Sequence, residues 1–279
     1  MIVKANAKIN LTLDIIDKRE DAYHNIDTIM QTVSLCDEIH ITKNNKGRIK
    51  LTCAKILLPN DDRNIAYKAA ESIFKYAGIE KMGVDIHIIK EIPTQAGLGG
   101  GSADAAAVLK AINELFNLNI SISELANIGS SLGADVPFCV LGGIKRCKGI
   151  GDVIEEVSSM PNCKLLLCKP EVGVDTKYAY EQCDKFPNTS KNSTKKMLEA
   201  LSVGNLKEVA KSISNRFDEV LHIPEIEVIK AIMKEKGALN AIMTGSGSTV
   251  YGIFEESFDT VEIEKELKEI GKCYVCTTI

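Results

Sequence analysis

The feature that most restricts the fold is an alternating run, a glycine-dense loop and a helix-forming run that follow one another closely. Residues 84–90 alternate between apolar and polar side chains, which predicts a strand. After Pro93 comes Gly97-Leu98-Gly99-Gly100-Gly101, in which Leu98 alone carries a side chain. From 102 to 116, apolar residues recur at helical spacing among strong helix formers. The segment therefore predicts a strand and a helix joined by a backbone with little side-chain bulk.

This loop predicts a phosphate-binding site. Glycines lack a Cβ atom, so their backbone can approach a ligand closely and direct several N–H groups at it. The helix that follows adds unpaired amides and the positive end of its dipole. A flexible turn before a helix is the alternative, but a run this rich in glycine is costly in folding entropy.

Three common phosphate loops do not fit the segment. A Walker A loop needs a Lys after its last glycine, and Ser102 stands there. The tripeptides HRD and DFG of protein kinases do not occur. A dinucleotide fingerprint fits Gly97 and Gly99 but has Ser102 in place of its third glycine. Its ribose carboxylate could only be Glu124, which forms a capping box with Ser121, so a dinucleotide-dependent oxidoreductase is weakly supported.

The rest of the chain mixes helix and strand signals. Residues 2–16 alternate cleanly, which predicts a half-buried strand. The polar segment 184–196 predicts a loop, and 195–236 is mostly helical in pattern. Residues 238–254 predict a strand, a glycine turn and a strand, and 256–270 a charged surface helix. The predicted fold class is α+β in two lobes, which divide after the glycine-rich turns that end near residue 151.

Composition and charge exclude several functional classes. The 279 residues carry a formal charge of −4, without the basic excess of a nucleic-acid-binding protein. No stretch approaches 18 apolar residues, and the first residues lack the apolar core of a signal peptide, so we expect a cytoplasmic protein without a membrane partner. Nine cysteines are scattered along the chain. Cys273 and Cys276 lack a partner motif at zinc-finger spacing and predict a terminal strand.

Four segments spread over the chain carry a recognisable set of motifs. They are AlaLysIleAsnLeu at 7–11, the glycine loop at 93–106, LeuGlyAlaAspValPro at 132–137 and ThrGlySerGlySerThrVal at 244–250. Together they resemble the GHMP kinase superfamily of small-molecule kinases. The resemblance implies a two-lobed α+β fold with an ATP-binding domain at 1–155 and a C-terminal domain at 156–279. It also implies that ATP and substrate bind in the cleft between the lobes.

Shorter pieces narrow the resemblance. These pieces resemble the corresponding segments of the branch of the superfamily that acts on a cytidine diphosphate-linked methylerythritol. They are Tyr23-His24, 30–32 and 99–104. This implies transfer of the ATP γ-phosphate to the 2-hydroxyl of that small molecule, in non-mevalonate isoprenoid synthesis. Kinases of the homoserine, mevalonate or phosphomevalonate type share the loop and are the alternatives. A catalytically silent nucleotide-binding protein is expected to have lost Lys8 or Asp135, and both are present.

Two residues are candidates for catalysis. On local grounds Lys8 is a solvated lysine on a strand, and Asp135 is a helix N-cap. The resemblance instead implies that Lys8 lies at the transferring phosphate, where an ammonium stabilises developing negative charge. It implies that Asp135 accepts the proton of the substrate hydroxyl. Because phosphoryl transfer is largely dissociative, Asp135 could also act mainly by positioning.

The resemblance also implies the binding residues. Asn64 and Lys90 match positions that reach the adenine, although a helix cap and a strand surface explain them almost as well. Tyr23, His24 and Tyr180 match a cytidine pocket, and Asn10 matches a contact to the methylerythritol. Mg²⁺ is expected to bind mainly through ATP phosphates and water, without a carboxylate cage. The residues expected to wrap the triphosphate are Pro93, Thr94, Gln95, Ala96, Gly97, Leu98, Gly99, Gly100, Gly101, Ser102 and Ala103.

Two positions depart from the pattern of the family. Asn6 stands where a Pro is usual, which changes only an edge-strand residue. Ala22 stands where a Gly precedes Tyr23. If this turn needs a positive φ, an alanine there is strained, so the local geometry of the turn at Tyr23 and His24 is the point to examine.

Overall fold

A computed structural model describes residues 1–54, 58–79, 82–186 and 193–279. The chain forms two compact units. The first comprises 1–7, 36–94 and 99–142, and the second comprises 8–35, 95–98 and 143–279. The strands β1 (Ile2–Lys18) and β2 (His24–Asn44) both run from one unit into the other. The predicted domains at 1–155 and 156–279 are continuous segments of the sequence, whereas these compact units are not. The domain limits therefore stay a prediction.

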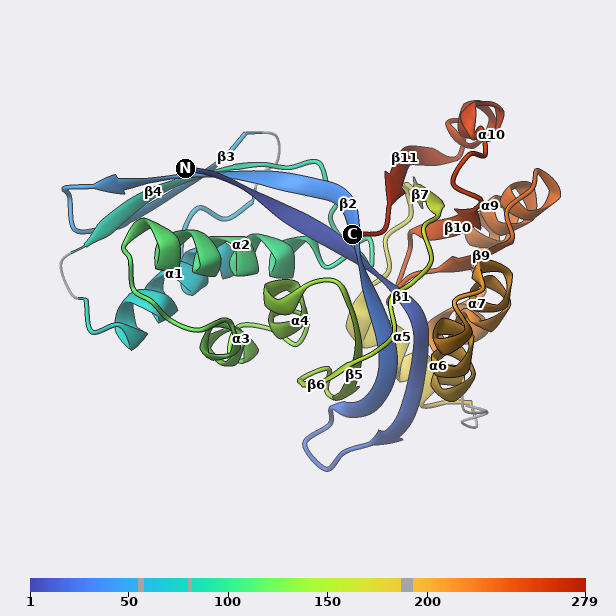
Figure 1. Ribbon diagram of the computed structural model, residues 1–279, viewed down its shortest axis with the longest axis horizontal. Helices are drawn as coiled ribbons and strands as arrows, with labels where there is room; N and C mark the ends of the chain where they lie inside the picture. The colour runs from blue at the N-terminus through green and yellow to red at the C-terminus, as the bar shows by residue number, and fades with distance from the viewer. Residues whose placement is uncertain (55–57, 80–81, 187–192) are drawn as a thin grey trace. The chain divides into compact units, whose positions relative to one another are not determined.

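The first unit is a sheet with helices on one face, as Figure 1 shows. Its strand order is β3-β4-β2, followed by the first residues of β1. β4 pairs antiparallel with β2 and parallel with β3. The other elements of this unit are β3 (Ile49–Cys53), β4 (Gly83–Ile89), α1 (Ile65–Tyr76), α2 (Gly100–Leu115), α3 (Ile122–Ser130) and α4 (Val136–Leu141).

The local predictions for this unit are confirmed. The alternating run at 84–90 forms β4, and the helix after the glycine loop is α2. Four alanines of α2 are almost fully buried, so the helix packs closely on its neighbours; they are Ala103, Ala105, Ala106 and Ala107. Ser121 and Glu124 form the predicted capping box at the start of α3.

The second unit contains a separate four-stranded sheet of order β11-β7-β10-β9, in which every neighbouring pair is antiparallel. In the same unit, β5 pairs antiparallel with the first half of β2, and β8 pairs parallel with β1. The elements of this unit are β5 (Ile144–Gly149), β6 (Val153–Glu156), β7 (Lys164–Pro170), α5 (Thr176–Cys183), α6 (Ser193–Val203), α7 (Leu206–Ser212), β8 (Ser214–Asn215), α8 (Arg216–Val220), α9 (Pro224–Glu235), β9 (Asn240–Met243), β10 (Val250–Phe254), α10 (Val261–Leu267) and β11 (Gly271–Thr277).

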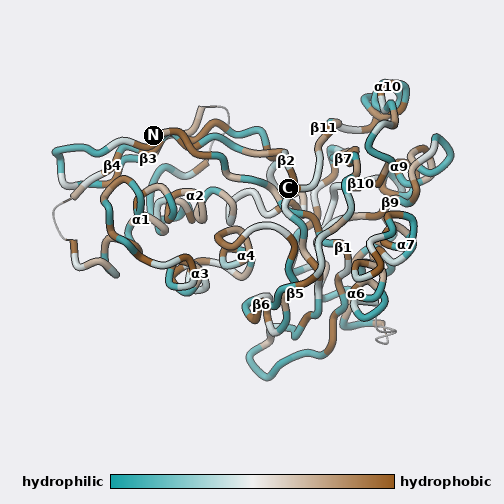
Figure 2. The backbone as a smooth tube through the Cα atoms, viewed as in Figure 1, coloured by the Kyte–Doolittle hydropathy of each residue, from teal (hydrophilic) through white to brown (hydrophobic). Residues whose placement is uncertain are grey.

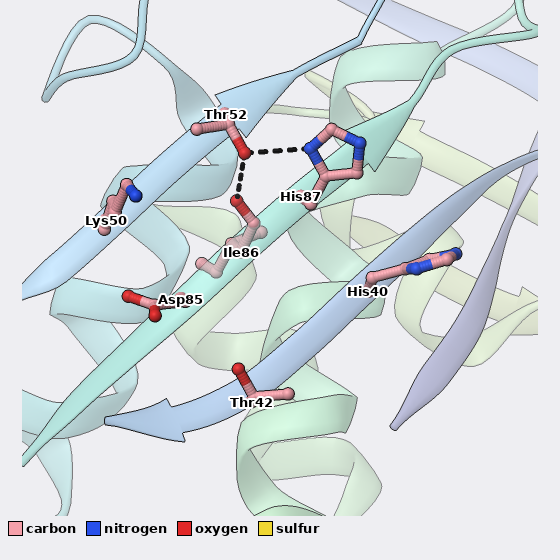
Figure 3. Close-up of a pocket in the computed structure, with 7 residues that line it drawn as sticks. All are labelled: His40, Thr42, Lys50, Thr52, Asp85, Ile86 and His87. Carbon is pink, nitrogen blue, oxygen red and sulfur yellow. Dashed lines mark hydrogen bonds between the residues drawn. The ribbon is translucent and has the colours of Figure 1, made fainter. Parts of the chain in front are cut away.

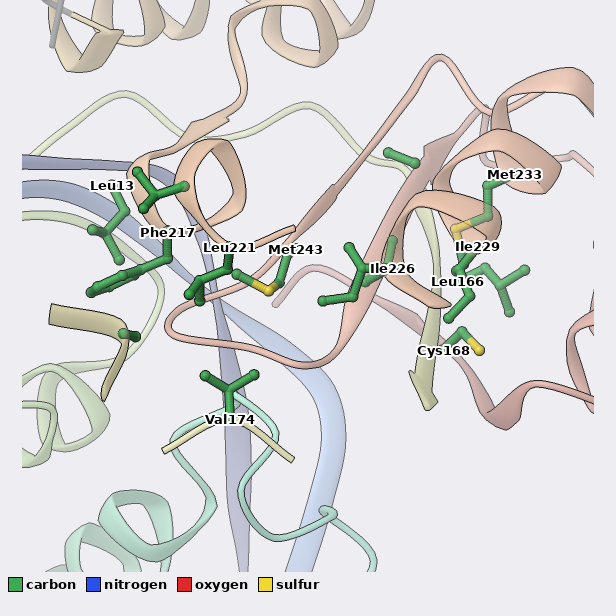
Figure 4. Close-up of a cluster of buried hydrophobic side chains, with 14 of the residues drawn as sticks. Leu13, Leu166, Cys168, Val174, Phe217, Leu221, Ile226, Ile229, Met233 and Met243 are labelled. Carbon is green, nitrogen blue, oxygen red and sulfur yellow. The ribbon is translucent and has the colours of Figure 1, made fainter. Parts of the chain in front are cut away.

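One apolar cluster forms the core of the second unit (Figure 4). β1 contributes Leu13, α8 contributes Phe217, β9 contributes Met243, and α9 contributes Ile226 and Ile229. These residues come from both ends of the sequence. The core therefore requires the N-terminal strand to pack among elements that follow it by some 200 residues.

The predicted half-burial of β1 is confirmed at the start of the strand, where Lys4 is exposed and Ala5 and Ala7 are buried, and it is wrong for the middle of the strand. From Lys8 to Asp14 both faces of the strand are buried, including the polar residues Lys8, Asn10, Thr12 and Asp14. The physical reason is that each polar side chain or its backbone finds a partner far away in sequence; for example, Asp14 accepts a hydrogen bond from the Thr194 backbone at 3.2 Å. Alternation predicted the strand, but it could not show that the polar face is also covered.

The other predictions for this unit fare better. The strand, glycine turn and strand at 238–254 are confirmed as β9 and β10, and 195–236 is mostly helical. The predicted surface helix is shorter than 256–270, because α10 ends at Leu267, and Figure 2 shows it as largely hydrophilic. Cys273 and Cys276 lie in the terminal strand β11, with free thiols. Of the predicted loop at 184–196, residues 187–192 lie outside the described residues.

Candidate active site

The glycine loop adopts a backbone conformation that depends on its glycines. Gly97 and Gly99 have φ angles of 73° and 67°, in the left-handed region that favours glycine. Gly99 is the N-cap of α2, and no side chain caps this end of the helix. The predicted glycine-dependent loop is therefore confirmed as a conformation, and the first turn of α2 presents its backbone amides without a competing side-chain acceptor.

Within the second unit, the loop packs against the other glycine motif of the chain. A Cβ atom on Gly97 would lie 2.1 Å from the carbonyl oxygen of Thr244, so a side chain has no room there. The Thr249 N–H also donates to the Ala96 carbonyl at 3.3 Å. The two glycine motifs, at 93–106 and 244–250, thus meet in one place. Sequence spacing alone could not show this contact.

Lys8 lies beside this meeting point. Its backbone N–H donates to the Leu98 carbonyl at 3.0 Å, and its side-chain ammonium donates to Asn10 Oδ1 at 2.7 Å. Lys8 is only 5% exposed, so it is not the solvated lysine of the local alternative. A buried ammonium next to a glycine loop is suited to hold a phosphate oxygen.

Both the backbone and the side chain of Asn10 form hydrogen bonds. Its backbone N–H donates to Thr244 Oγ1 at 2.9 Å, its side-chain amide donates to Thr28 Oγ1 at 2.8 Å, and its carbonyl accepts from the Tyr251 hydroxyl at 3.0 Å. These bonds fix which end of the amide faces Lys8, because the NH₂ group is already engaged by Thr28. Asn10 therefore orients the ammonium of Lys8.

Asp135 belongs to the first unit. It occupies the N-cap position of α4, as the local alternative predicted, but its side chain makes no capping hydrogen bond. The loop that carries it adjoins the start of α2: a Cβ atom on Gly133 would lie 3.9 Å from Ser102 Oγ. The carboxylate is thus not used as a helix cap, and its loop lies next to the glycine loop's helix.

The two residues expected at the adenine have partners within the first unit. Asn64 caps α1: its Oδ1 accepts from the Ala66 N–H at 2.9 Å, and its Nδ2 donates to the Pro59 carbonyl at 3.0 Å. The Lys90 ammonium lies between the carboxylates of Asp37 and Asp104. These bonds engage two of the three N–H groups of the ammonium, and the Lys90 side chain is only 3% exposed, so a base could reach it only if neighbouring residues moved.

The structure brings two of the expected cytidine residues together. The rings of His24 and Tyr180 are stacked, with centroids 4.6 Å apart and planes at 16°. His24 Nε2 lies 2.7 Å from Asp184 Oδ1. Tyr23 is 63% exposed, and Ala22 before it has a φ of 67°, so the strained turn expected there is present.

Asp184 is a residue that the sequence interpretation missed. Hydrogen bonds from Lys18 and then His24 hold the pKa of its carboxyl below the usual range, so it is ionised at neutral pH. It follows Tyr180 by four residues on α5 and its C-cap, a spacing that places both on one face of the helix. That spacing was the signal available in the sequence.

The described residues contain no cluster of three or more side chains suited to hold a metal ion. A hollow on the sheet of the first unit is lined by His40, His87 and neighbours, none of which is a predicted site residue (Figure 3). Among the described helices, none is both long and apolar enough to cross a membrane. The glycine loop and Lys8 remain the features that fit a triphosphate.

Comparisons with known proteins agree with the fold. Residues 64–143 match the GHMP kinases N terminal domain, and residues 197–273 match the GHMP kinases C terminal domain. A mevalonate kinase from Methanococcus jannaschii superposes with a TM-score of 0.77 at 18% identity, covering 100% of this chain and 98% of that one. At that identity the match shows the fold alone. The class that the fold and the loop define is therefore the GHMP kinases.

More similar proteins narrow the class. The chain is 45% identical to 4-diphosphocytidyl-2-C-methyl-D-erythritol kinase of Caldicellulosiruptor saccharolyticus, covering 100% of this chain and 96% of the relative. The same kinase of Acetivibrio thermocellus is 43% identical, with coverages of 99% and 98%. A crystal structure of 4-(cytidine 5'-diphospho)-2C-methyl-D-erythritol kinase superposes with a TM-score of 0.84 at 29% identity, covering 100% and 99%. The chain belongs to the 4-diphosphocytidyl-2-C-methyl-D-erythritol kinase family.

Proposed function

We infer that this chain transfers the γ-phosphate of ATP to the 2-hydroxyl of 4-diphosphocytidyl-2-C-methyl-D-erythritol, which gives the 2-phosphate and ADP. The reaction belongs to non-mevalonate isoprenoid biosynthesis. The observation that carries the inference is the bonding of Lys8 to the glycine loop, in a chain 45% identical over its whole length to a kinase of that name. The structural neighbours of the mevalonate type are less than 25% identical and give no support to that alternative.

The proposed mechanism assigns two residues to the transfer. Lys8, oriented by Asn10, stabilises the negative charge that develops on the transferring phosphoryl group. Asp135 accepts the proton of the 2-hydroxyl or holds that hydroxyl in line for attack. Because the transition state is loose, most of the rate enhancement comes from position and charge rather than from early proton removal.

The glycine loop and the start of α2 are proposed to bind the triphosphate. Pro93 to Ala103 supply the backbone amides, and the left-handed turns at Gly97 and Gly99 support close approach. Asn64 is proposed near the adenine, at the N-terminal end of α1 that it caps. Mg²⁺ is proposed to bind through ATP phosphates and water, where it would neutralise phosphate charge.

The cytidine end of the substrate is proposed to bind at Tyr23, His24 and Tyr180, and the methylerythritol end at Asn10. The stacked pair of His24 and Tyr180 supports this, because aromatic faces bind a base and an imidazole can hydrogen-bond its edge. Asp184 supports it further, since its bond to His24 Nε2 fixes the orientation of that ring.

Three further proposals concern the domains, the class of ligand and the location of the protein. The predicted domains at 1–155 and 156–279 bind ATP and substrate in a cleft between them. The ligands are small molecules and not nucleic acid, in keeping with a formal charge of −4. A cytoplasmic location is supported by the nine cysteines, all of which are free thiols.

The test is an assay of ADP release with several alcohols: the full cytidine-linked substrate, methylerythritol phosphate, homoserine and mevalonate. Base stacking and one hydrogen bond each contribute about 1–3 kcal/mol, so methylerythritol phosphate should be used at least about thirtyfold less efficiently. His24→Ala should narrow this gap, because it harms the full substrate alone. Equal turnover of the two substrates by the unmodified enzyme would overturn the cytidine pocket and the assignment within the family.

A further inference from the structure

The Lys90 ammonium, just after β4, lies between two buried carboxylates of the first unit. It donates to Asp104 Oδ2 at 2.8 Å and also to Asp37 Oδ2. The three side chains are no more than 4% exposed. Burial alone would lower the pKa of Lys90, but Asp104 and Asp37 raise it above the ordinary value, so the lysine stays charged. Two of the three N–H groups of this buried cation are therefore bonded to carboxylates of the same unit.

Asp37 also holds the backbone that leads into the glycine loop. Its Oδ1 accepts the Glu91 N–H at 2.6 Å and the Ile92 N–H at 2.8 Å. These are the last residues before Pro93, where the loop starts. Because one carboxylate binds both this backbone and Lys90, the start of the loop and the ammonium are fixed relative to each other.

Asp104 connects the same ammonium to the other end of the loop. It lies in α2, one helical turn after Gly100. A Cβ atom on Gly100 would lie 2.9 Å from Ile92 Cγ2 and 3.4 Å from Lys90 Nζ. The first turn of α2 therefore packs directly on the segment that Asp37 holds, and a side chain at this position would separate them.

A buried ion cluster is poor evidence for stability, because the loss of hydration offsets most of the attraction between the charges. What such a cluster can supply is a fixed position for the backbone segments that carry it. Each side chain is held in one orientation by its hydrogen bonds, and these bonds hold the attached segments in place. Here those parts are the two ends of the glycine loop. A loop whose ends are already fixed loses less freedom when a ligand binds.

We propose that Asp37, Lys90 and Asp104 form a positioning triad that fixes both ends of the glycine loop for the triphosphate, and that Lys90 does not contact the adenine base. The proposal rests on the proposed function in one respect, that the loop binds ATP. Under this proposal, Lys90 and Asp104 affect the binding of ATP only by fixing the glycine loop. Substitution of Lys90 or Asp104 should therefore weaken the binding of every nucleoside triphosphate to the same extent, whatever its base.

The test compares the binding of ATP and GTP by calorimetry, without an acceptor alcohol. Asp104→Leu cuts the bond to α2 and leaves one cation with one carboxylate, so the buried charges stay balanced. It should raise the Kd of ATP and of GTP together, by about tenfold, with their ratio within twofold of the original. Asp104→Asn keeps an acceptor for Lys90 and should restore most of the affinity. Lys90→Met leaves Asp37 and Asp104 without their cation, so it should raise both Kd values at least as much as Asp104→Leu does, with their ratio again unchanged.

Arg146 provides the matched control, because it too binds two carboxylates, those of Asp27 and Glu155, but belongs to β5. Glu155→Leu and Arg146→Met should leave both Kd values unchanged. If Lys90→Met reduces the preference for ATP over GTP while Asp104→Leu does not, Lys90 contacts the base and the proposal fails. Unchanged Kd values in a folded Asp104→Leu protein would overturn it as well.

The outcome separates this proposal from the proposed function. Binding is measured without the acceptor, so an error in the acceptor's identity leaves the result intact. If the unmodified protein binds neither ATP nor GTP, the loop is not a triphosphate site and both proposals fall. If it binds ATP but the assay of ADP release finds no activity on the cytidine-linked alcohol, the proposed function alone fails.

Discussion

The carboxyl of Asp104 is buried, and among the described residues its Oδ1 has no hydrogen-bond partner. Burial raises the pKa of Asp104 to about 7, although Lys90 opposes the shift. The folded protein therefore holds a proton that the unfolded chain releases near pH 4. Between about pH 4 and pH 7 the folded state binds more protons, so from this group the free energy of unfolding falls as pH rises.

Asp104→Asn should remove this dependence, because an amide does not titrate. We expect the slope of the unfolding free energy, at most about 1.4 kcal/mol per pH unit from one proton, to flatten between pH 5 and pH 7. Urea unfolding at several pH values would measure it. The same slope in both proteins would show that Asp104 does not carry the proton.

Substitutions of Lys8 and Asp135 should affect the phosphoryl-transfer step more than they affect the binding of ATP. Asp135→Asn changes charge but hardly shape, so turnover should be abolished while ATP still binds. Lys8→Met should lower kcat more than it raises the KM for ATP, if the ammonium acts mainly in the transition state. Single-turnover rates and ATP titrations measure both effects. A variant within threefold of the original rate would remove that residue from the catalytic set.

At the scale of elements, the glycine loop depends on contact as well as on backbone freedom. Gly97→Ala would place a Cβ atom 2.1 Å from the Thr244 carbonyl oxygen, at a φ of 73°. We expect a large loss of ATP affinity in a protein that still folds, measured by titration. Gly78→Ala is the matched control: its φ is 66°, but no atom lies within 4 Å of the added Cβ. It should lose about 1 kcal/mol of stability and no affinity.

Elements whose signals are local could be predicted from the sequence. The alternation of β4, the glycines after it and the capping box of α3 each depend on residues close together in the chain. The covered polar face of β1 could not be predicted, because Asn10 finds its partners at Thr28 and Thr244. No periodicity records such contacts.

The site shows the same limit. The glycine loop could be predicted as a phosphate site from its residues alone. The roles of Lys8 and Asp135 came only from the family resemblance, because locally a strand lysine and an N-cap explain them. The bond between Lys90 and Asp37 joins residues 53 positions apart, and no spacing rule predicts it.

At the scale of the whole molecule, the second unit is assembled from separate parts of the chain. A fragment of residues 143–279 lacks 8–35, and with it the partners of β5 and β8 and the core residue Leu13. We expect this fragment to show no cooperative unfolding transition by circular dichroism. Its co-expression with residues 1–142 should restore activity. A cooperative transition in the isolated fragment would show that the second unit does not need β1 and β2.

The same feature bears on how the protein is made. About a hundred residues separate Leu35 from Gly143, so at 5–20 residues per second the ribosome needs on the order of 5–20 s to reach the rest of the second unit. Throughout that interval the nascent chain exposes the apolar side chains of 8–35 without the partners that cover them. We therefore expect the yield of folded protein to depend on how fast this stretch is translated and on whether chaperones bind residues 8–35 in the interval, as well as on the stability of the finished fold.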